Sequence, residues 1–380
     1  MGREKRIGIY FTSGSNWLGG VYYLINLVNS FNYSLKDEIE LPHFVIFYND
    51  KSERFIKLFE YPKISYIKLD ELDNRKGFFK SLVLRKNYFY PKKIQEAKLN
   101  GLYPFNDFPA KINTKVKLIS WYPDLQHKFY PEYFNKFKLW QREFRLKMLL
   151  KRSDHLVLSS QDVLSHFNQF YDLSKIKTSV LPFVSLTSKN DIVSIDILIK
   201  KYNIPTSYFI VSNQFYIHKD HITLFKALAV LRKTERQIMV LITGKMEDYR
   251  DPSYINQLKT LIEKEDLSSS IKLMGVIDRN DQLSLMKHSI AVIQPSLFEG
   301  WSTVVEDAKS LGVGIIASDI AIHKEQLDGQ GVLFNHADSN SLASAMAKVI
   351  ENPKMASVNF DYNKNIVDFT HQFEKLFSTQ

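Results

Sequence analysis

The sequence contains no cysteine, which excludes disulfides, thiolate metal sites and cysteine nucleophiles and fits a reducing compartment. It also lacks a run of about eighteen apolar residues, the length that a membrane-spanning helix needs. The first residues, MGREKRIGIYF, lead directly into a strand-like segment instead of the apolar stretch of a signal peptide. These absences predict a cytoplasmic protein.

The 380 residues, 44% of them hydrophobic, can bury a large core and are enough for two domains. Their net charge of +10 is distributed unevenly. Residues 51–150 hold 22 Lys and Arg against 10 Asp and Glu, a net charge of +12, and the rest of the chain is at −2. A basic region of this kind favours a polyanionic partner, and charge alone leaves nucleic acid, anionic lipid and a phosphorylated substrate open.

Strand-like and helix-period segments alternate from end to end, which is typical of parallel sheets with crossover helices. The sequence therefore predicts an α/β fold with one doubly wound sheet in each half. The expected strands are 5–12, 43–50, 64–69, 116–123, 155–160 and 179–184 in the first half, and 208–213, 238–244, 270–276, 290–296, 314–319 and 331–334 in the second.

The polar stretch 185–194 is the best candidate for a linker between two domains. We place an N-terminal domain at 1–190, a C-terminal domain at 191–355 and a final helical segment at 356–380. Apolar positions recur along that segment at helical spacing, at Ile366, Phe369, Phe373 and Phe377. The helix could pack back on either domain, and we choose the N-terminal one.

Two glutamates, Glu299 and Glu306, lie seven positions apart where a buried strand leads into a helix. We expect that helix at 303–311, ended by Gly312. One interpretation is a capping box, in which Thr303 and Glu306 only satisfy backbone donors at the helix start.

The other interpretation of this turn is an anion site. The free N–H groups from Ser302 to Val304 would then point at a phosphate, as helix N-termini do. Glu306 would bind the two vicinal hydroxyls of a ribose, and Glu299 would face the group beyond the phosphates. The motif alone supports the cap and the site equally.

A second polar turn, SNQFYIHKDH, follows the expected strand 208–213. Asp220 is expected to cap the next helix, which puts Lys219 beside the positive end of that helix. A lysine is disfavoured there unless an anion occupies the site, although the cost is only roughly a few tenths of a kcal/mol. Lys219 is therefore a candidate phosphate ligand, with a solvated surface lysine as the alternative.

Two further turns follow strands of the first half. Gly19 and Gly20 precede a helix, where they would let a ligand approach the backbone or simply form a strand-to-helix turn. Asp124 and His127 lie just beyond the strand 116–123, at the sheet edge where parallel sheets collect functional residues. A single histidine is more often structural than catalytic, so both interpretations stay open.

In combination these turns resemble family 4 of the retaining glycosyltransferases, the bacterial surface-polysaccharide type with the GT-B fold. The resemblance runs through the glycine pair, PDLQH at 123–127, NQFYIHKDH at 213–221 and above all EGWSTVVE at 299–306, to which we assign the E-x7-E mark of that family. It implies two Rossmann-like doubly wound domains that face each other across a cleft. The first would hold the acceptor and the second the nucleotide sugar.

The resemblance also implies roles for the residues that match it. Glu306 would bind the donor ribose, Glu299 the transferred sugar and Lys219 the pyrophosphate. The candidate catalytic residues are Glu299, His127, Asp124 and Lys219. The candidate donor-binding residues are Gly19, Gly20, Asn213, Gln214, Lys219, Gly300, Trp301, Ser302, Thr303, Val304 and Glu306. Many members have an arginine where this chain has Asn213 and Gln214, which leaves the pyrophosphate with one cation fewer.

The implied activity is transfer of a hexose, of the mannose or glucose type, from a UDP- or GDP-sugar to a glycan or lipid-linked acceptor in surface polysaccharide or lipopolysaccharide synthesis. Lys219 and helix amides would stabilise the charge that builds on the departing diphosphate. No two aspartates stand with a single residue between them, so we expect no divalent metal and no cofactor.

Two basic stretches, 76–93 and 137–152, mix cations with aromatic residues and leucines, as an interfacial helix does. They predict peripheral docking on the inner face of an anionic cell membrane, with a solvated basic face as the alternative. We expect no nucleic-acid partner, because the sequence has no RRM or KH motif. Two other candidate functions keep the fold, namely a non-catalytic partner subunit and a sugar-nucleotide epimerase.

Overall fold

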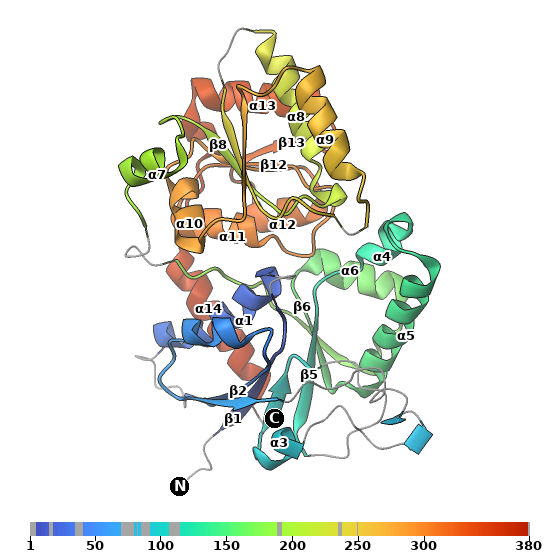
Figure 1. The fold of residues 1–380 in the computed structure, drawn as a ribbon. Helices are drawn as coiled ribbons and strands as arrows, with labels where there is room; N and C mark the ends of the chain where they lie inside the picture. The colour runs from blue at the N-terminus through green and yellow to red at the C-terminus, as the bar shows by residue number, and fades with distance from the viewer. Residues whose placement is uncertain are drawn as a thin grey trace. The chain divides into compact units, whose positions relative to one another are not determined.

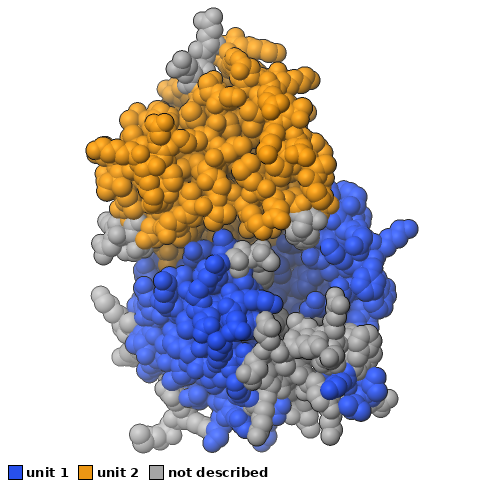
Figure 2. All heavy atoms as spheres, viewed as in Figure 1, with its two compact units in different colours: residues 1–184, 363–380 blue, residues 185–362 orange. Residues whose placement is uncertain are grey.

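The chain divides into two compact units, which a computed structural model describes in detail. Unit 1 comprises residues 1–184 and 363–380, and unit 2 comprises residues 185–362 (Figures 1 and 2). The structure describes residues 5–14, 18–34, 41–69, 80–81, 83–84, 92–105, 115–187, 192–234, 238–248 and 250–378. Each unit is built around its own sheet and is described by itself.

Unit 1 contains a seven-stranded sheet, parallel throughout, in the order β3-β2-β1-β4-β5-β6-β7. Its strands are β1 (Arg6–Phe11), β2 (His43–Tyr48), β3 (Ile64–Lys68), β4 (Gly101–Tyr103), β5 (Lys117–Tyr122), β6 (His155–Leu158) and β7 (Lys177–Val180). In the register of β1, Ile7 is paired with Phe44 on one side and Gly101 on the other. Short apolar runs of this kind suit strands that are covered on both faces.

The helices of unit 1 include two whose starts are set by polar caps. Asn135 accepts a hydrogen bond from the amide of Lys138, and Ser160 accepts one from the amide of Val163, so each satisfies a free donor of the first turn. The helical elements are α1 (Leu18–Ser30), η2 (Phe31–Ser34), η3 (Glu53–Leu58), α3 (Lys92–Glu96), α4 (Gln126–Phe129), η4 (Pro131–Tyr133), α5 (Lys136–Arg152), α6 (Gln161–Phe170) and, at the end of the chain, α14 (Tyr362–Lys375).

Unit 2 contains a six-stranded parallel sheet in the order β10-β9-β8-β11-β12-β13. Its strands are β8 (Phe209–Ser212), β9 (Val240–Thr243), β10 (Ile271–Gly275), β11 (Val292–Gln294), β12 (Ile315–Ser318) and β13 (Val332–Phe334). Its helical elements are α7 (Ile195–Tyr202), η6 (Ile217–Lys219), α8 (His221–Arg232), α9 (Tyr254–Lys264), α10 (Arg279–Lys287), α11 (Thr303–Leu311), α12 (Ala321–Leu327), α13 (Ser339–Glu351) and η7 (Pro353–Ala356).

The core of unit 2 consists of two apolar clusters, one on each face of the sheet. Phe209 and Val211 of β8 belong to one cluster and Ile210 between them belongs to the other. Successive side chains of a strand point to opposite faces, so this alternation means that both faces are buried under helices. The two-sheet α/β architecture expected from the sequence is therefore confirmed.

The structure differs from the sequence-based expectation in one strand and two boundaries. Strand β4 was not predicted, because three residues are too few to show a periodic pattern. The chain enters unit 2 at Ser185, earlier than the expected 190/191, because the hydroxyls of Ser185 and Thr187 already bond to α11. It returns to unit 1 after Tyr362, within the segment expected at 356–380.

Helix α14, drawn in red beside α1 in Figure 1, packs on the core of unit 1 from residue 363 onward. The Thr370 hydroxyl donates to Ser30 at the end of α1 over 2.9 Å. The ring of Phe373 makes edge contacts with Phe31 and Tyr103, with centroids 6.2 and 5.0 Å away. The last segment of the sequence thus completes the core of the first unit.

Replacing Phe373 with alanine should lower the free energy of unfolding of unit 1 by about 3 to 5 kcal/mol, because a fully buried ring would leave a cavity. Chemical denaturation followed by a unit 1 tryptophan measures this loss. Phe137→Ala is the matched control, because that ring is 70% exposed and its removal should leave the midpoint unchanged. Equal midpoints for the two variants would show that α14 does not contribute to the core.

Candidate active site

The candidate site of unit 2 lies where the strand order of its sheet reverses. From β8 the chain continues to β9 and β10 on one side, and from β11 to β12 and β13 on the other, so β8 and β11 are neighbours. Ligands of open parallel sheets bind beyond the carboxyl ends of the strands at such a reversal. The turns that follow β8 and β11 are joined by a hydrogen bond from the amide of Leu297 to the carbonyl of His218.

Lys219 and Glu299 come from these two turns and form an ion pair. Lys219 Nζ lies 2.5 Å from Glu299 Oε1, and the two side chains are only 16% and 9% exposed. Asp220 follows in the left-handed conformation and caps α8 through the amide of Thr223, as expected from the sequence. The anion that compensates Lys219 at this helix start is therefore a carboxylate of the chain itself.

Neutral donors hold the Glu299 carboxylate in addition to Lys219. The Ser296 hydroxyl and the Gln294 side-chain amide donate to the same oxygen, Oε1, over 2.7 and 2.8 Å. Burial is the largest single effect and raises the pKa of Glu299, but the charge and hydrogen bond of Lys219, the electrostatic effect of His323 and the hydrogen bond of Ser296 together lower it by more. The pKa therefore lies below its ordinary value. Glu299 is thus held as an oriented, ionised carboxylate.

Asn213 belongs to the same network through a neutral bond. Its side-chain amide donates to Gln294 Oε1 over 2.9 Å, and both side chains are buried. Gly244 at the end of β9 allows this close packing, because a Cβ there would lie 2.1 Å from the carbonyl oxygen of Asn213. At the position where the resembling family often has an arginine, this chain therefore orients Gln294 instead of supplying a second cation.

His323 is a fully buried histidine that interacts electrostatically with the ion pair. His323 Nδ1 lies 2.9 Å from the backbone carbonyl of Ser318 and 3.0 Å from its hydroxyl, which itself donates to the carbonyl of Ser296. Both Ser318 oxygens therefore act as acceptors for the ring, so Nδ1 carries the proton. Nε2 has no hydrogen-bond partner in the described part of the chain. Burial lowers the pKa of His323 to about 4, although Glu299 raises it, so the ring is neutral at pH 7.

Helix α11 begins at Thr303 and ends at Gly312 in the left-handed conformation, as the sequence predicts. Ser302, however, is the N-cap and accepts from the amide of Val305. The Ser302 amide itself donates to Gln326 Oε1, so it is not available to a ligand. The amides of Thr303 and Val304 are left as free donors of the first turn among the described residues.

Glu306 is buried and takes no part in a capping box with Thr303. Its Oε1 accepts from Lys309 over 3.0 Å and from Gln326 over 2.9 Å, and its Oε2 accepts from the Tyr362 hydroxyl over 2.8 Å. The capping-box interpretation is therefore wrong, because these three side chains take the carboxylate away from the helix start. Glu306 is instead a carboxylate oriented by tertiary contacts.

Gly300, Trp301, Val304 and Gln214 complete the predicted donor-binding residues of this unit. Gly300 is buried in the turn after β11, and Lys309 Nζ lies 5.8 Å from the centre of the Trp301 ring. Val304 is partly buried against the apolar core, so its side chain serves packing and only its amide remains for a ligand. Gln214 is partly exposed at the end of β8.

Gly19 and Gly20 of unit 1 lie in the first turn of α1, which begins at Leu18. The expectation that they precede the helix is wrong, and neither glycine has a positive φ. Their amides belong to the first turn, where an α-helix has free N–H groups. The glycine pair thus contributes backbone donors at the carboxyl edge of the sheet, without an unusual turn.

Asp124 and His127 follow the end of β5 at the same edge of the unit 1 sheet. The Asp124 carboxylate accepts from the amide of Gln126 over 2.9 Å and so shapes the turn into α4. His127 is buried, and neither ring nitrogen has a hydrogen-bond partner in the described residues. Burial, together with the charges of Arg142 and Lys128, lowers its pKa to about 4, so His127 is neutral at pH 7.

Unit 2 matches a known protein family. Residues 194–365, almost the whole of unit 2, match the family model of the glycosyl transferases group 1. These residues, slightly less than half of the chain, therefore have the sequence of a group 1 glycosyltransferase domain. The resemblance inferred from the turns of the sequence is therefore confirmed, and we call residues 194–365 the group 1 domain.

Individual relatives of the group 1 domain are distant. The chain is 23% identical over 252 residues to the O-antigen chain mannosyltransferase RfbU of Salmonella typhimurium, covering 64% of this chain and 66% of that protein. It is 25% identical over 215 residues to an uncharacterized glycosyltransferase of Methanocaldococcus jannaschii, covering 55% of this chain and 50% of that one. The matched regions thus span less than two thirds of these relatives.

Solved structures share the fold over nearly the whole chain. Anabaena HepE in complex with UDP and glucose has a TM-score of 0.70 at 17% identity, covering 98% of this chain and 99% of that one. Sucrose-phosphate synthase from Thermosynechococcus elongatus has a TM-score of 0.64 at 14% identity, covering 98% and 96%. The fold of the chain is GT-B, with two Rossmann-like units.

The group 1 domain also requires a correction to the assignment of the E-x7-E mark. Only six residues separate Glu299 from Glu306, and the carboxylate that follows seven intervening residues is Asp307. Asp307 is fully buried, and its two oxygens accept from Arg279 over 2.5 and 2.8 Å. Two adjacent carboxylates, Glu306 and Asp307, are thus candidates for the ribose position.

Sequence reasoning missed several residues of this network. A glutamine inside the apolar strand β11 was an available signal, because a polar side chain in a buried strand needs a partner. His323, Gln326 and Tyr362 carry no such signal, because their partners lie 5 to 56 positions away in the sequence and only the fold brings them together. Among the described residues no group of three His, Asp or Glu could hold a metal ion.

The stability of the group 1 domain should fall as the pH drops from about 6.5 to 4, partly because of His323. Its pKa of about 4 in the folded chain lies below the unfolded value, so in this window only the unfolded chain binds the proton and folding is favoured by rising pH. In His323→Asn, which keeps a donor toward Ser318, the loss of stability between pH 7 and 4 should be smaller by about 3 kcal/mol. Urea denaturation at both pH values measures it, and equal losses would contradict the buried neutral state of His323.

Proposed function

We propose that the protein is a retaining, metal-independent glycosyltransferase that transfers a hexose from a UDP- or GDP-sugar to a glycan or lipid-linked acceptor. The observation that carries this proposal is the oriented pair of Lys219 and Glu299 at the strand-order reversal of a group 1 domain. A cation and a carboxylate beside two free helix amides suit a diphosphate joined to a sugar.

The relatives support the choice of pathway and sugar class. One of them is named as an O-antigen chain mannosyltransferase, and one similar structure contains UDP and glucose. Another is named as a glycosyltransferase involved in lipopolysaccharide biosynthesis, with a TM-score of 0.61. A hexose of the mannose or glucose type and a surface polysaccharide or lipopolysaccharide acceptor are therefore the substrates that we propose.

Lys219 is the residue to which we assign stabilisation of the leaving group. Glycosyl transfer passes through an oxocarbenium-like state while negative charge builds on the departing diphosphate. A preorganised cation that is largely removed from water stabilises such charge strongly. Lys219 would share its three protons between Glu299 and the β-phosphate, and the amides of Thr303 and Val304 would bind further oxygens.

Glu299 is assigned to the transferred sugar and His127 to the acceptor side. Among the described residues no group donates to Glu299 Oε2, in contrast to Oε1, so one side of the carboxylate can accept sugar hydroxyls. A neutral His127 can accept a hydrogen bond but does not deliver a proton at pH 7. We therefore propose that a departing phosphate oxygen takes the proton of the acceptor. Metal independence rests on the lack of an aspartate pair with one residue between its members.

The ribose would bind to one hydrogen-bond site on Glu306 or Asp307. An ionised carboxylate has about four lone-pair sites, and each of these two already receives three protein hydrogen bonds. Oε2 of Glu306 and Oδ2 of Asp307 each retain one site. We therefore propose that one of these two carboxylates accepts a single hydrogen bond from a ribose hydroxyl, in place of the bidentate contact with Glu306 that the sequence suggested.

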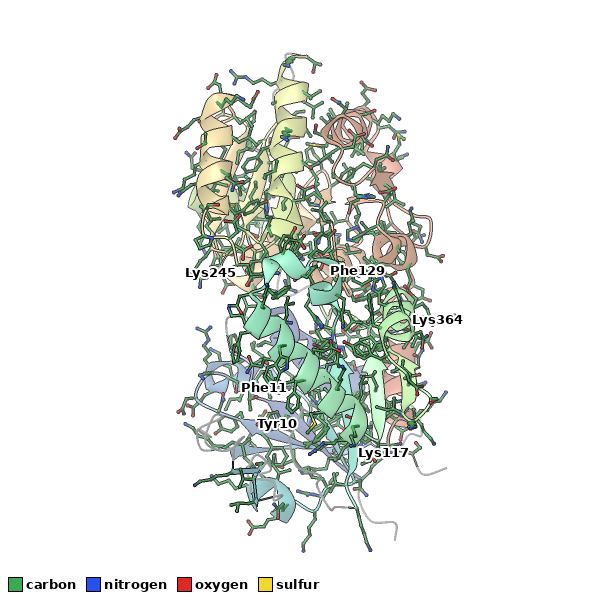
Figure 3. All side chains as sticks on the ribbon, turned by 90° about the vertical axis from the view of Figure 1, so that its right-hand side faces the viewer. Tyr10, Phe11, Lys117, Phe129, Lys245 and Lys364 are labelled. Atoms are coloured by element: carbon green, nitrogen blue, oxygen red, sulfur yellow. The ribbon has the colours of Figure 1, made fainter. Side chains whose placement is uncertain are left out.

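Removing the charge of Lys219 should abolish most of the activity. In Lys219→Met, kcat for transfer to acceptor, or for hydrolysis of the donor alone, should fall by about 10²- to 10³-fold. Coupled detection of released UDP or GDP measures both reactions. Lys245→Met is the matched control, because Lys245, labelled in Figure 3, is exposed and pairs with Glu247.

The same assay separates the alternative of a non-catalytic partner subunit, which the missing arginine favours. A wild-type protein that hydrolyses no UDP- or GDP-sugar, with or without acceptor glycans, would support that alternative. Equal kcat in the Lys219 and Lys245 variants would instead remove Lys219 from the mechanism.

We also propose that α5 docks unit 1 on an anionic membrane surface. Phe137, Trp140 and Phe144 stand on one face of this helix, opposite the buried Leu146 and Leu149, and their rings stack along it with centroids 6.2 and 5.6 Å apart. Figure 3 shows α5 with its outer side chains facing the viewer.

The charge of α5 matches an acidic surface. The helix carries seven Lys and Arg and a single acidic residue, Glu143, which is bonded to Lys128 and Tyr171. The other basic stretch, 76–93, lies outside the described residues except for 80–81, 83–84 and 92–93. Among the described residues, no helix has the length and apolar character to span a bilayer. Peripheral contact through aromatic and basic side chains is the mode that α5 supports.

The wild-type protein should float with anionic liposomes at low salt and dissociate at high salt, because each basic residue near the surface contributes about 1 kcal/mol. Phe137→Ser combined with Trp140→Ser should abolish flotation, since the rings are 70% and 62% exposed and free to insert. Ile197→Ser, an exposed apolar residue of α7, is the control. No flotation of the wild type at low salt would refute membrane docking.

A further inference from the structure

Helix α11 holds both segments through which the chain passes between the two units. The outgoing passage enters unit 2 at Ser185, and the returning passage leaves it after Tyr362. The Tyr362 hydroxyl donates to Glu306, and the Ser185 hydroxyl donates to Asp307. One helix turn later, Thr187 is hydrogen-bonded to Ser310. Two adjacent carboxylates of α11 are therefore tied to two different passages.

The two passages are also joined to each other at the same point. The amide of Ser185 donates to the Tyr362 hydroxyl over 2.7 Å, while that hydroxyl donates to Glu306. Three hydrogen bonds and the peptide bond between Glu306 and Asp307 thus close a ring of Ser185, Tyr362, Glu306 and Asp307, which we call the clasp. All four residues belong to unit 2.

Three of the four clasp residues are shielded from water, and Tyr362 is half-buried. Ser185, Glu306 and Asp307 are 1%, 2% and 0% exposed. Burial and the charge of Glu306 raise the pKa of Tyr362, which keeps its hydroxyl protonated and able to donate. Removing one partner of a buried carboxylate costs a large free energy, because part of the buried charge is left without a hydrogen-bond donor.

The clasp explains how the candidate ribose carboxylates keep their orientation without facing solvent. Glu306 is held from three directions by Lys309, Gln326 and Tyr362. Asp307 is held by Arg279 and Ser185. Packing alone does not require the Tyr362 hydroxyl, since a phenylalanine ring would fill the same space. The hydroxyl therefore serves to orient Glu306 and to receive the Ser185 amide.

We propose that Tyr362 and Ser185 are positioning residues that orient the carboxylates of α11 for the donor ribose, so that donor binding and the two chain passages stabilise each other. This inference rests on the proposed function for the identity of the ligand. By thermodynamic linkage, if a bound ligand makes formation of the clasp more favourable by some factor, breaking the clasp must weaken binding of that ligand by the same factor.

The first experiment tests the clasp without ligand, by hydrogen exchange at the Ser185 amide of the full chain. In Tyr362→Phe this amide loses its acceptor and should exchange at least about tenfold faster than in the wild type. Tyr202→Phe is the matched control, because it removes another tyrosine hydroxyl of unit 2 that bonds to a carboxylate, Asp281. Unchanged protection in Tyr362→Phe would overturn the clasp, whatever the protein binds.

The second experiment measures the affinity of UDP and GDP and of their 2′,3′-dideoxy forms by calorimetry. The Tyr362→Phe or Ser185→Ala variant should bind the ribonucleotide about tenfold more weakly than the wild type does. It should bind the dideoxy form with the same affinity as the wild type. A ribose-specific loss in Tyr362→Phe assigns the ribose to Glu306, and a ribose-specific loss in Ser185→Ala assigns it to Asp307.

The outcomes separate the inference from the proposed function. An equal loss for both nucleotide forms would mean a merely structural role and overturn the positioning of the ribose, as would no loss in either variant. If the wild type binds neither UDP nor GDP, the proposed function fails and the coupling to a donor falls with it. The exchange experiment then still decides whether the clasp joins the two passages.

Discussion

The reversal of strand order between β8 and β11 is the constraint on which the candidate site depends. It places two turns side by side that are 80 residues apart in the sequence, and each supplies one charge. A lysine at a helix start and a carboxylate among buried side chains would each be costly alone. Together they form one oriented pair, and Gln294, Ser296 and Asn213 complete its hydrogen bonds.

Helix α11 combines three tasks that follow from its place in the sheet. Its apolar residues Val305, Ala308 and Leu311 pack against the core of unit 2. Its first-turn amides face the carboxyl edge of the sheet, where parallel folds bind anions. Its carboxylates, Glu306 and Asp307, hold the two chain passages. A change at any of these contacts acts on the others, because the helix is a single rigid element.

Unit 1 contributes groups of a different character. His127 is neutral and buried, and the amides of Gly19 and Gly20 stand at a helix start. The ion pair of Lys128 and Glu143 beside His127 is more exposed than that of Lys219 and Glu299. The charge of this unit is instead collected on α5, outside the core. This division agrees with the GT-B fold, in which the resemblance assigns the nucleotide sugar to the second domain and the acceptor to the first.

The sequence by itself determined the α/β class, most of the strands and the limits of α11, because these features depend on local patterns. Alternating or continuous runs of apolar residues indicate strands buried on one or both faces, and Gly312 indicates where a helix ends. The pairing of Lys219 with a carboxylate was not predictable in the same way, although both residues were singled out. The residues that flank each of them in the sequence do not indicate which strands are adjacent in the sheet.

Only the tertiary structure decided the partners of the buried charges and the roles of the two carboxylates on α11. Glu306 looked like a capping residue from its spacing to Thr303, but Gln326 and Tyr362 come from elements that lie 20 and 56 positions later and turn it inward. Asp307 went unnoticed beside it. The physical reason is that a buried charge is stabilised by whatever donors the fold brings within about 3 Å, and their distance in sequence has no bearing on that energy.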